Sequence, residues 1–291
     1  MIETPLPFRL SKLKKLAVYL ALVALCLPAL MPLLWMVSTS FKTDAQVFAT
    51  GGQGAPPVTL GSFIPHPFDF TNYPKALAAV PFQLYLRNTV FLVVVTVLGA
   101  VFSSAVVAHG FAKCHISGKG LLFGLMLATM ALPGQVTMVP YFVLFRTLGW
   151  YGTYLPLVVP VCFGVPFYIF LMTQFMRSLP VDLYEAGRID GVNEWRLFTK
   201  VTLPLSRPAL ATCALFQFVN TWNDFLGPLL YLNNPARYTV AYGLQQFLSR
   251  NGGQWTMLMA ASTIFVVPVF LVFLMAQKTF VEGIATTGGK N

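Results

Sequence analysis

Apolar stretches alternate with short polar segments along the whole chain. Six of these stretches are almost free of charge and long enough to cross a membrane, since about 20 apolar residues span the hydrocarbon core. A helix also satisfies its own backbone hydrogen bonds in lipid. The stretches are residues 16–37, 89–108, 121–145, 151–176, 208–232 and 255–277. The pattern predicts an all-α integral membrane protein with six transmembrane helices, forming a single domain over residues 1–291.

Several of these stretches contain proline. Examples are Pro28 and Pro32 in the first, Pro133 followed by Gly134 in the third, and Pro268 in the sixth. Proline removes a backbone donor and kinks a helix. The sequence therefore predicts bent helices, which suit the wall of a cavity and also occur as passive packing.

Composition supports a membrane protein and excludes one other class. Hydrophobic residues make up 56% of the chain and charged residues 10%, whereas soluble domains carry about 25% charged residues. The net charge of +10 could indicate a nucleic-acid-binding protein. The basic residues, however, are scattered among the apolar stretches and form no stripe or RNA-binding motif, so we exclude nucleic acid as a partner.

The basic residues also predict an orientation. Six spans place both termini on one side, and 13 of the 19 lysines and arginines fall on that side. An excess of lysine and arginine marks the cytoplasmic side. Both termini are therefore expected to be cytoplasmic, and the segments 42–86 and 233–254 are expected to face outward.

The sequence offers no catalytic or metal-binding constellation. No pair among the four cysteines has metal or redox spacing, and we interpret them as small apolar packing residues: Cys26, Cys114, Cys162 and Cys213. The histidines have no carboxylate at ligand or triad spacing, and His109 and His115 are expected at the surface. No phosphate-binding loop is present. We predict a transport subunit rather than an enzyme, with no catalytic residue, metal or cofactor of its own.

The most charged segment lies between the fourth and fifth stretches, at residues 180–204. Pro180 suits a first helical turn, Gly191 is expected to end a short helix, and Asn193 can cap a second one. Trp195, Phe198 and Val201 repeat at helical spacing and give the second helix an apolar stripe. Pro204 is expected to end that helix, and Pro208 to open the next span. The segment thus predicts a helix–turn–helix on the cytoplasmic surface.

Two interpretations of this segment follow from its residues. It could be an amphipathic helix that lies in the lipid headgroups, or a surface on which another protein docks. The small residues Ala186 and Gly187 beside Glu185 favour docking, because they let a partner's backbone approach closely.

The segment "EAGRIDGVNEWRLFTKVTLPLSRPAL" resembles the EAA loop of ABC-importer permeases. Glu185, Ala186, Gly191, Leu203 and Pro204 match the pattern, and Gly187 replaces a second alanine. In that family the segment forms coupling helices that sit in a groove of the cytoplasmic ATPase. The resemblance implies the following ATPase-coupling residues: Glu185, Ala186, Gly187, Arg188, Asp190 and Gly191.

Further motifs extend the resemblance over most of the chain. They include "STSFK", "FTNYPKAL", "YLRNTV", the stretch from Ala131 to Pro160, and "WNDFLGPLLYL". Together they resemble the shorter six-span permease of maltose-type carbohydrate importers. This implies a subunit of a bacterial or archaeal cytoplasmic (inner) membrane. Its implied partners are a second homologous permease, two cytoplasmic ATPases that bind ATP and Mg, and an extracytoplasmic sugar-binding protein.

Asp224 is the only charge inside any of the six stretches, and a charge in a membrane by default marks a pathway or a partner. Gln217, Asn220 and Asp224 are spaced to share one helix face. Amides and a carboxylate bind sugar hydroxyls, and the ring of Trp222 could stack on a pyranose. We predict a substrate path of Gln217, Asn220, Trp222, Asn223 and Asp224. Alternatively, Asp224 caps a helix or pairs with Arg87 or Arg146.

Other interpretations of the whole chain also stay open. The protein could be an ABC permease for another solute, or a self-sufficient secondary carrier. A secondary carrier usually needs several ion-binding acids, whereas the predicted spans contain only one acidic residue. The tail from Val281 to Asn291 resembles the segment that reaches into the ATPase pair, and could equally be a frayed terminus. The segment from Asn233 to Gln254 resembles the loop that meets the binding protein, and could equally be a connector. The sequence does not identify the sugar.

Overall fold

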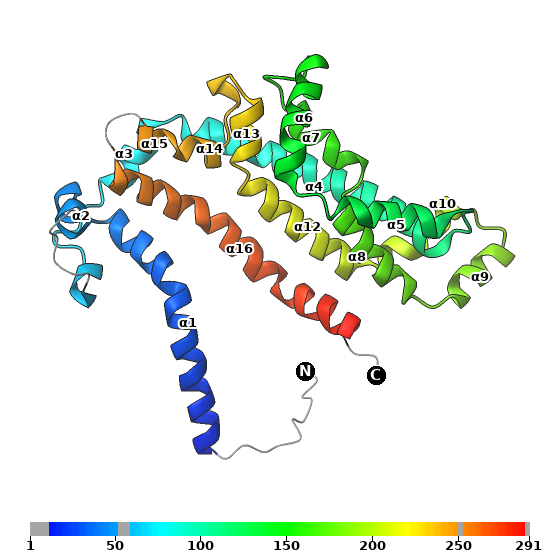
Figure 1. The fold of residues 1–291 in the computed structure, drawn as a ribbon. Helices are drawn as coiled ribbons and strands as arrows, with labels where there is room; N and C mark the ends of the chain where they lie inside the picture. Colours follow the sequence, from blue (N-terminus) through cyan, green and yellow to red (C-terminus); the bar gives the residue numbers. More distant parts are fainter. Residues whose placement is uncertain (1–11, 52–58, 250–252, 289–291) are drawn as a thin grey trace. The chain divides into compact units, whose positions relative to one another are not determined.

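The computed structural model describes residues 12–51, 59–249 and 253–288, and every regular element in these ranges is helical (Figure 1). This confirms the predicted all-α class. The chain divides into two compact units, residues 1–79 with 247–264 and residues 80–246 with 265–291. This division does not test the prediction of a single domain over 1–291, which stays a prediction.

The first unit contains α1 (Lys12–Ser40), α2 (Asp44–Gly51), η1 (Leu60–Phe63) and α3 (Asn72–Ala79). The second unit contains α4 (Phe82–Lys113), α5 (Lys119–Thr129), α6 (Gly134–Thr147), α7 (Leu155–Val158), η2 (Pro160–Phe163), α8 (Pro166–Arg177), α9 (Asp182–Ile189), α10 (Glu194–Leu197), η3 (Phe198–Thr202), α11 (Leu203–Leu205), α12 (Arg207–Trp222), α13 (Leu226–Tyr231), η4 (Pro235–Arg237) and α14 (Val240–Leu244). Two helices contribute residues to both units: α15 (Gln246–Ser249) and α16 (Trp255–Gly288).

Four helical segments in the described chain are long and apolar enough to cross a membrane. They are Lys14–Ser40, Phe82–Lys113, Leu155–Arg177 and Trp255–Gln277. These segments contain or closely match the predicted spans 16–37, 89–108, 151–176 and 255–277. A fifth candidate is the pair α5 and α6, if the two helices together form one span.

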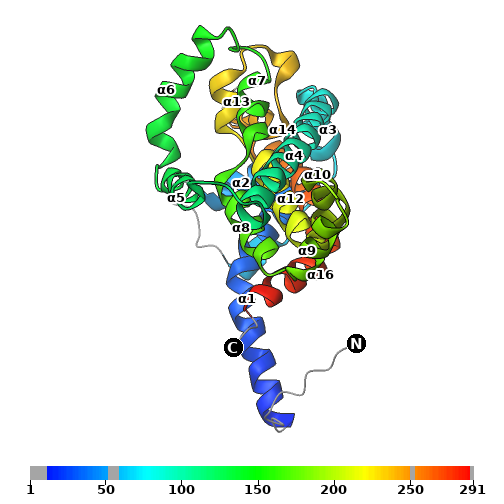
Figure 2. The same cartoon turned by 90° about the vertical axis from the view of Figure 1, so that its right-hand side faces the viewer.

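The other two predicted spans are not continuous helices. Within 121–145, α5 and α6 meet at an angle of 95°, which Figure 2 shows as a sharp turn of the chain. Pro133 lies at this turn and has no backbone N–H to continue a helical ladder. The bend at Pro133 is therefore larger than the kink that the sequence predicts.

Within 208–232, α12 ends at Trp222 and α13 begins at Leu226. Pro228 has no N–H, so a continuous helix would leave the carbonyl of Asp224 without its donor. Side chains cap the two ends instead: Asn223 Nδ2 donates to Val219 O at 2.9 Å, and Gly227 N donates to Asp224 Oδ1 at 2.9 Å. The count of six spans stays a prediction, since four or five candidates are found in the described residues.

The second unit is built around α4, which packs against α8 and α12 (Figure 1). Ala100, Ala105 and Ala108 are buried in this core with Met172 and Cys213. Small residues let membrane helices approach closely without a hydrophobic driving force. The α9–α10 segment lies at one end of this bundle, and α13 and α14 lie at the other.

A break interrupts the segment Leu155–Arg177 between η2 and α8. Gly164 has a φ of +101°, a backbone conformation that glycine adopts without steric cost. The amide of Val165 then donates to the hydroxyl of Ser104 on α4 at 3.0 Å. One side chain of α4 thus satisfies a backbone group that the break would leave without a partner.

In the first unit, polar side chains secure the chain just after α1. Asn72 Nδ2 donates to the carbonyls of Ser40 and Lys42 at 3.0 and 2.8 Å. The ammonium of Lys42 lies 3.9 Å from the ring centroid of Trp35. Asp44 accepts a hydrogen bond from Thr256 at 2.8 Å, which ties the start of α2 to the start of α16.

Candidate functional site

The first half of the segment 180–204 contains the predicted short helix, but Pro180 precedes its first turn, since α9 begins at Asp182. Helix α9 ends at Ile189, and Gly191 follows with a φ of +72°. Asn193 then caps α10 by accepting a hydrogen bond from Arg196 N at 2.9 Å. The predicted helix–turn–helix, with its glycine turn and asparagine cap, is confirmed.

The second helix ends at Leu205, one residue after the predicted end at Pro204. It is formed by α10, a π-helical turn, η3, and α11 in succession. In the π turn Leu203 N bonds to Phe198 O. This wider hydrogen-bond spacing accommodates the missing N–H of Pro204. Pro208 lies in the first turn of α12, as expected.

The predicted apolar stripe packs against the chain itself. Phe198 is buried, and the ring of Phe102 on α4 lies edge-on to the rings of Phe198 and Trp195 at 6.3 and 6.4 Å between centroids. Trp195 is nevertheless 55% exposed. Leu197, which is outside the predicted stripe, is also buried, and its side chain lies against Gly187 of α9.

The predicted coupling residues fall into two sets. Glu185, Ala186, Asp190 and Gly191 are exposed. Gly187 is partly buried, and a Cβ at this position would come within 2.6 Å of Leu197 Cδ2. A side chain at residue 187 would therefore make the Leu197 side chain move, so packing between α9 and α10 also favours a small residue here. The sequence interpretation had explained the small residue by a partner's approach alone.

Arg188 also points into the segment rather than outward. Its Nε and Nη2 donate to Glu194 Oε1 at 3.0 and 2.9 Å, and Nη2 also donates to the carbonyl of Lys113 at 2.9 Å. Lys113 is the last residue of α4, and its ammonium donates to Leu179 O at 2.9 Å. The charged residues of the segment thus attach α9 and α10 to the end of α4.

A buried network of three polar side chains lies beneath the segment, and sequence reasoning did not predict it. Tyr184 is 1% exposed, and its hydroxyl lies 3.0 Å from the hydroxyl of Thr202. The Thr202 hydroxyl lies 3.0 Å from Nδ1 of His109 on α4. His109 was expected at the surface, but it is 5% exposed, because the segment covers the end of α4.

The pKa values of Tyr184 and Cys114, beside the segment, are shifted by their surroundings. Burial raises the pKa of the Tyr184 hydroxyl, although its hydrogen bond with Thr202 acts in the opposite direction. Burial also raises the pKa of the Cys114 thiol, and the neighbouring carboxylate of Glu194 raises it further. Both groups are therefore kept neutral by their surroundings.

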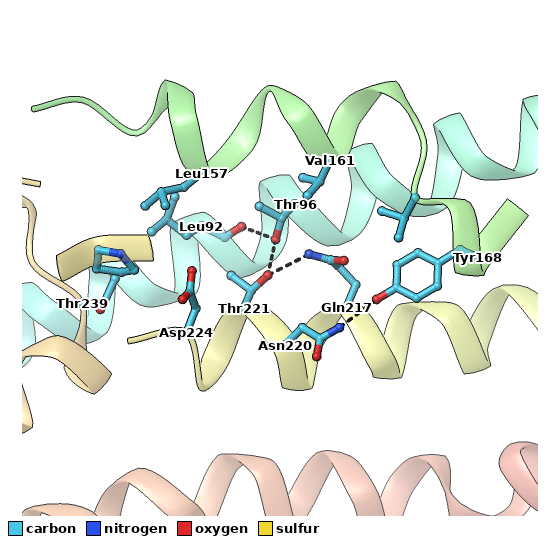
Figure 3. Close-up of a pocket in the computed structure, with 12 residues that line it drawn as sticks. Leu92, Thr96, Leu157, Val161, Tyr168, Gln217, Asn220, Thr221, Asp224 and Thr239 are labelled. Atoms are coloured by element: carbon cyan, nitrogen blue, oxygen red, sulfur yellow. Dashed lines mark hydrogen bonds between the residues drawn. The ribbon is translucent and has the colours of Figure 1, made fainter. Parts of the chain in front are cut away.

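The other candidate site is a cavity of about 350 Å³ in the second unit (Figure 3). Its walls come from α4, the α7–η2–α8 segment, α12 and α13, together with the residue before α14. The lining residues are Leu92, Thr96, Leu157, Val161, Val165, Tyr168, Gln217, Asn220, Thr221, Asp224, Pro228 and Thr239.

Three of the five predicted path residues line this cavity: Gln217, Asn220 and Asp224. Asn220 Nδ2 donates to the hydroxyl of Tyr168 at 3.2 Å. Gln217 Nε2 donates to the hydroxyl of Thr221 at 2.9 Å. The spacing argument therefore correctly placed these three side chains together.

A directed chain of hydrogen bonds crosses one wall of the cavity, as the dashed lines in Figure 3 show. Thr96 donates to Leu92 O at 2.8 Å, so its oxygen can accept from Thr221 at 2.9 Å. Thr221 in turn accepts from Gln217. Sequence reasoning missed Thr96, Thr221 and Tyr168, because hydroxyl groups in an apolar stretch carry little signal on their own.

The other two predicted path residues do not line the cavity. Trp222 is 3% exposed; its Nε1 donates to Phe265 O at 3.1 Å, and its ring stacks with that of Phe265 at 5.4 Å. It cannot offer a flat face to a sugar in this structure. Asn223 is exposed and bonds back to Val219 O.

Asp224 lines the cavity, and its Oδ1 also caps the start of α13 rather than the outer end of the predicted span. It forms no ion pair with Arg87 or Arg146, all three residues lying within the described ranges. A Cβ at Gly227 would come within 2.4 Å of Asp224 Oδ2 and 2.8 Å of Leu157 Cδ2. The carboxylate is thus held tightly against the start of α13.

Comparison with known proteins gives the chain a family. Residues 112–285 match the family described as the inner membrane component of binding-protein-dependent transport systems. The chain is 31% identical over 252 residues to the diacetylchitobiose uptake permease NgcG of Streptomyces coelicolor, which covers 86% of this chain and 80% of that protein. It is 30% identical over 263 residues to the arabinooligosaccharide transport permease AraQ of Halalkalibacterium halodurans, covering 90% and 91%.

A solved structure supports the same fold. A chain of a bacterial ABC transporter involved in the import of the acidic polysaccharide alginate matches with a TM-score of 0.79 at 24% identity, covering 95% of this chain and 100% of that one. The named relatives are permease proteins of uptake and transport systems, and other relatives are described as ABC transporter permeases, so they are transport proteins and not enzymes. Since the family match covers more than half of its length, the chain belongs to the family of inner membrane components of binding-protein-dependent transport systems.

Proposed function

We propose that this chain is a permease subunit of an ATP-driven carbohydrate importer, that it forms half of the translocation path, and that a separate ATPase drives it. The observation that carries the proposal is the cavity lined by amides, hydroxyls and one carboxylate inside an otherwise apolar bundle. Such groups bind sugar hydroxyls through several individually weak hydrogen bonds, so a sugar could enter and leave. The named relatives that take up oligosaccharides support the same substrate class.

The exposed residues of α9 and its turn are the proposed ATPase contact: Glu185, Ala186, Asp190 and Gly191. Gly187 and Arg188 make contacts within the protein. Gly187 lies against Leu197 of α10, and Arg188 is hydrogen-bonded to the end of α4. A movement of the ATPase would therefore be passed to α4, which also forms a wall of the cavity. Closure of the ATPase subunits on ATP can switch the cavity between its inward-facing and outward-facing states only if the closed ATPase binds one of these states more tightly than the other.

The partners in this proposal are a second homologous permease, two ATPase subunits carrying ATP and Mg, and an extracytoplasmic binding protein. The chain would lie in the cytoplasmic membrane with both termini on the cytoplasmic side. The segment from Asn233 to Gln254 would then face the binding protein, although residues 250–252 lie outside the described part of the chain. The tail residues 289–291 also lie outside it.

Reconstitution tests the proposal. The complete complex would be placed in liposomes, and uptake of labelled neutral oligosaccharides would be measured with and without ATP and with and without an ion gradient. Uptake that requires ATP and the binding protein is expected. Uptake driven by a proton or sodium gradient alone would instead identify a secondary carrier.

A photo-crosslinking amino acid at position 186 tests the ATPase contact in the same complex. Crosslinks to the ATPase are expected from position 186, and none are expected from position 115, which is exposed in the turn after α4. Persistent absence of the crosslink from position 186 in an assembled complex would contradict the assignment.

A further inference from the structure

Three side chains with metal-binding atoms meet where α10 begins, at the end of α4: His109, Cys114 and Glu194. His109 Nε2 and Cys114 Sγ each lie 3.7 Å from Glu194 Oε2. All three ligand atoms lie within 4.8 Å of one another. The cluster is separate from the cavity and does not include the exposed residues proposed to meet the ATPase.

The imidazole of His109 points to a missing ligand. Its Nε2 is buried and has no hydrogen-bond partner in the described part of the chain. The distance of 3.7 Å to Glu194 Oε2 is too long for a hydrogen bond. A buried polar atom without a partner costs about 1–3 kcal/mol, so such an atom calls for an explanation.

The other ring nitrogen is fixed in the way that metal-binding histidines require. If Nδ1 carries the proton, it donates to Thr202 Oγ1 at 3.0 Å, and the Thr202 hydroxyl can donate to Leu197 O at 3.4 Å. The Tyr184 hydroxyl, 3.0 Å away, can donate to the second lone pair of Thr202. Every proton then has an acceptor, and the lone pair of Nε2 faces the thiol and the carboxylate. A second partner that orients the ring is typical of metal sites.

Glu194 is also oriented for such a role. Its Oε1 accepts both hydrogen bonds from Arg188, which leaves Oε2 directed toward His109 and Cys114. The guanidinium lowers the charge that the carboxylate presents to a cation, but it also holds the group in place.

We propose that His109 Nε2, Cys114 Sγ and Glu194 Oε2 bind Zn²⁺. Nitrogen, sulfur and oxygen ligands together suit zinc, with bonds of about 2.0–2.3 Å to the metal. Tetrahedral geometry then requires ligand atoms about 3.5 Å apart. The two pairs with Glu194 Oε2, at 3.7 Å, need to move by only a few tenths of an ångström, and His109 Nε2 and Cys114 Sγ lie within 4.8 Å of each other. The cation displaces the thiol proton of Cys114 to solvent, so the residue binds as a thiolate although its surroundings keep the metal-free thiol neutral. A water completes the fourth position.

Such a site would clamp the first residue of α10 to the end of α4. The sequence could not show it, because His109 and Cys114 are five residues apart and Glu194 comes 80 residues later. The spacing rule for metal motifs applies to ligands on one local segment. The proposal concerns metal binding alone and does not depend on the transported solute.

Cobalt titration tests the proposal. The full chain in detergent, freed of any affinity tag and of metal, would be titrated with Co²⁺ and then with Zn²⁺. A thiolate-to-cobalt absorption band is expected in the near ultraviolet, with visible bands typical of tetrahedral cobalt. Zinc should displace the cobalt and remove both.

Matched variants separate this site from other binding. Cys114→Ser should abolish the thiolate band, and His109→Gln and Glu194→Gln should each weaken binding at least tenfold. Cys162→Ser and His115→Gln, which replace the same residue types outside the cluster, should leave binding unchanged. Size-exclusion profiles would confirm that each variant is folded. Absence of the band in the folded wild type, its persistence in Cys114→Ser, or equal affinity of wild type and His109→Gln would overturn the proposal.

Discussion

At the scale of single residues, the helical repeat explains which side chains reach the cavity. Each residue of a helix advances by about 100°, so Gln217, Asn220 and Thr221 fall on one side of α12. Trp222 falls roughly 140° from Gln217 by the same repeat, and it is indeed buried against Phe265. The prediction of a stacking tryptophan failed because its residue type was weighed without its angular position. That angle could have been worked out from the sequence.

The role of Asn220 can be tested by transport. Replacing its amide removes one hydrogen-bonding group from the cavity, and one such bond contributes about 1 kcal/mol. Asn220→Ala should therefore raise the KM for the transported sugar several-fold in reconstituted complexes. Asn223→Ala is the matched control, because that amide is exposed and bonds to its own helix.

Asp224→Asn extends the same test. It keeps the size of the side chain and an oxygen that can cap α13, but removes the charge from the cavity. If Asn220→Ala and Asp224→Asn both left transport rate and sugar preference unchanged, the cavity would not be part of the path.

At the scale of elements, hydropathy located the apolar segments but not their breaks. The spans 16–37, 89–108 and 255–277 lie within single helices. The apolar segments 121–145 and 208–232 are each divided by a backbone turn, and 151–176 is interrupted after Gly164. Hydropathy averaged over a window of residues does not show where a proline removes a backbone hydrogen-bond donor. Pro133 and Pro228 were the local signals, and only the fold shows which prolines break a helix and which, like Pro268 inside α16, do not.

The turn between α9 and α10 also gives a prediction at this scale. Gly191 has a φ of +72°, and the left-handed conformation costs other residues about 1–2 kcal/mol. Gly191→Ala should therefore lower the thermal unfolding midpoint of the full chain in detergent. It should also weaken the photo-crosslink from position 186, since α9 would be displaced from α10.

Gly124→Ala provides the comparison. Gly124 lies inside α5 with nothing within 4 Å of a Cβ, and alanine favours a helix over glycine by about 1 kcal/mol. This variant should be neutral or slightly more stable. An equal loss of stability in both variants would show that the turn geometry is not the cause.

At the scale of the whole molecule, the segment 180–204 is joined to α4 by polar contacts. Arg188 contacts both Glu194 and the end of α4, so it connects the proposed ATPase contact to a helix that lines the cavity. Sequence reasoning identified the segment and assigned Arg188 to the partner. It could not show the inward orientation, which depends on α4 ending beside α9.

Replacing Arg188 should uncouple ATP hydrolysis from transport. In Arg188→Gln complexes, uptake should fall at least tenfold while the ATPase keeps its basal hydrolysis, because the contact between segment and bundle is lost. Arg196→Gln, whose side chain is exposed on α10, serves as the control. An unchanged number of sugars transported per ATP in Arg188→Gln would contradict this role.

The hydrogen bond from Val165 to Ser104 has a consequence for how the chain folds in the membrane. The break after Gly164 lies near the middle of the segment Leu155–Arg177, where lipid offers no acceptor for the amide. The acceptor belongs to a helix made 61 residues earlier. The break after Gly164 is therefore expected to be stable in lipid only once the segment Leu155–Arg177 has packed against α4, so folding of the later segment depends on the earlier helix.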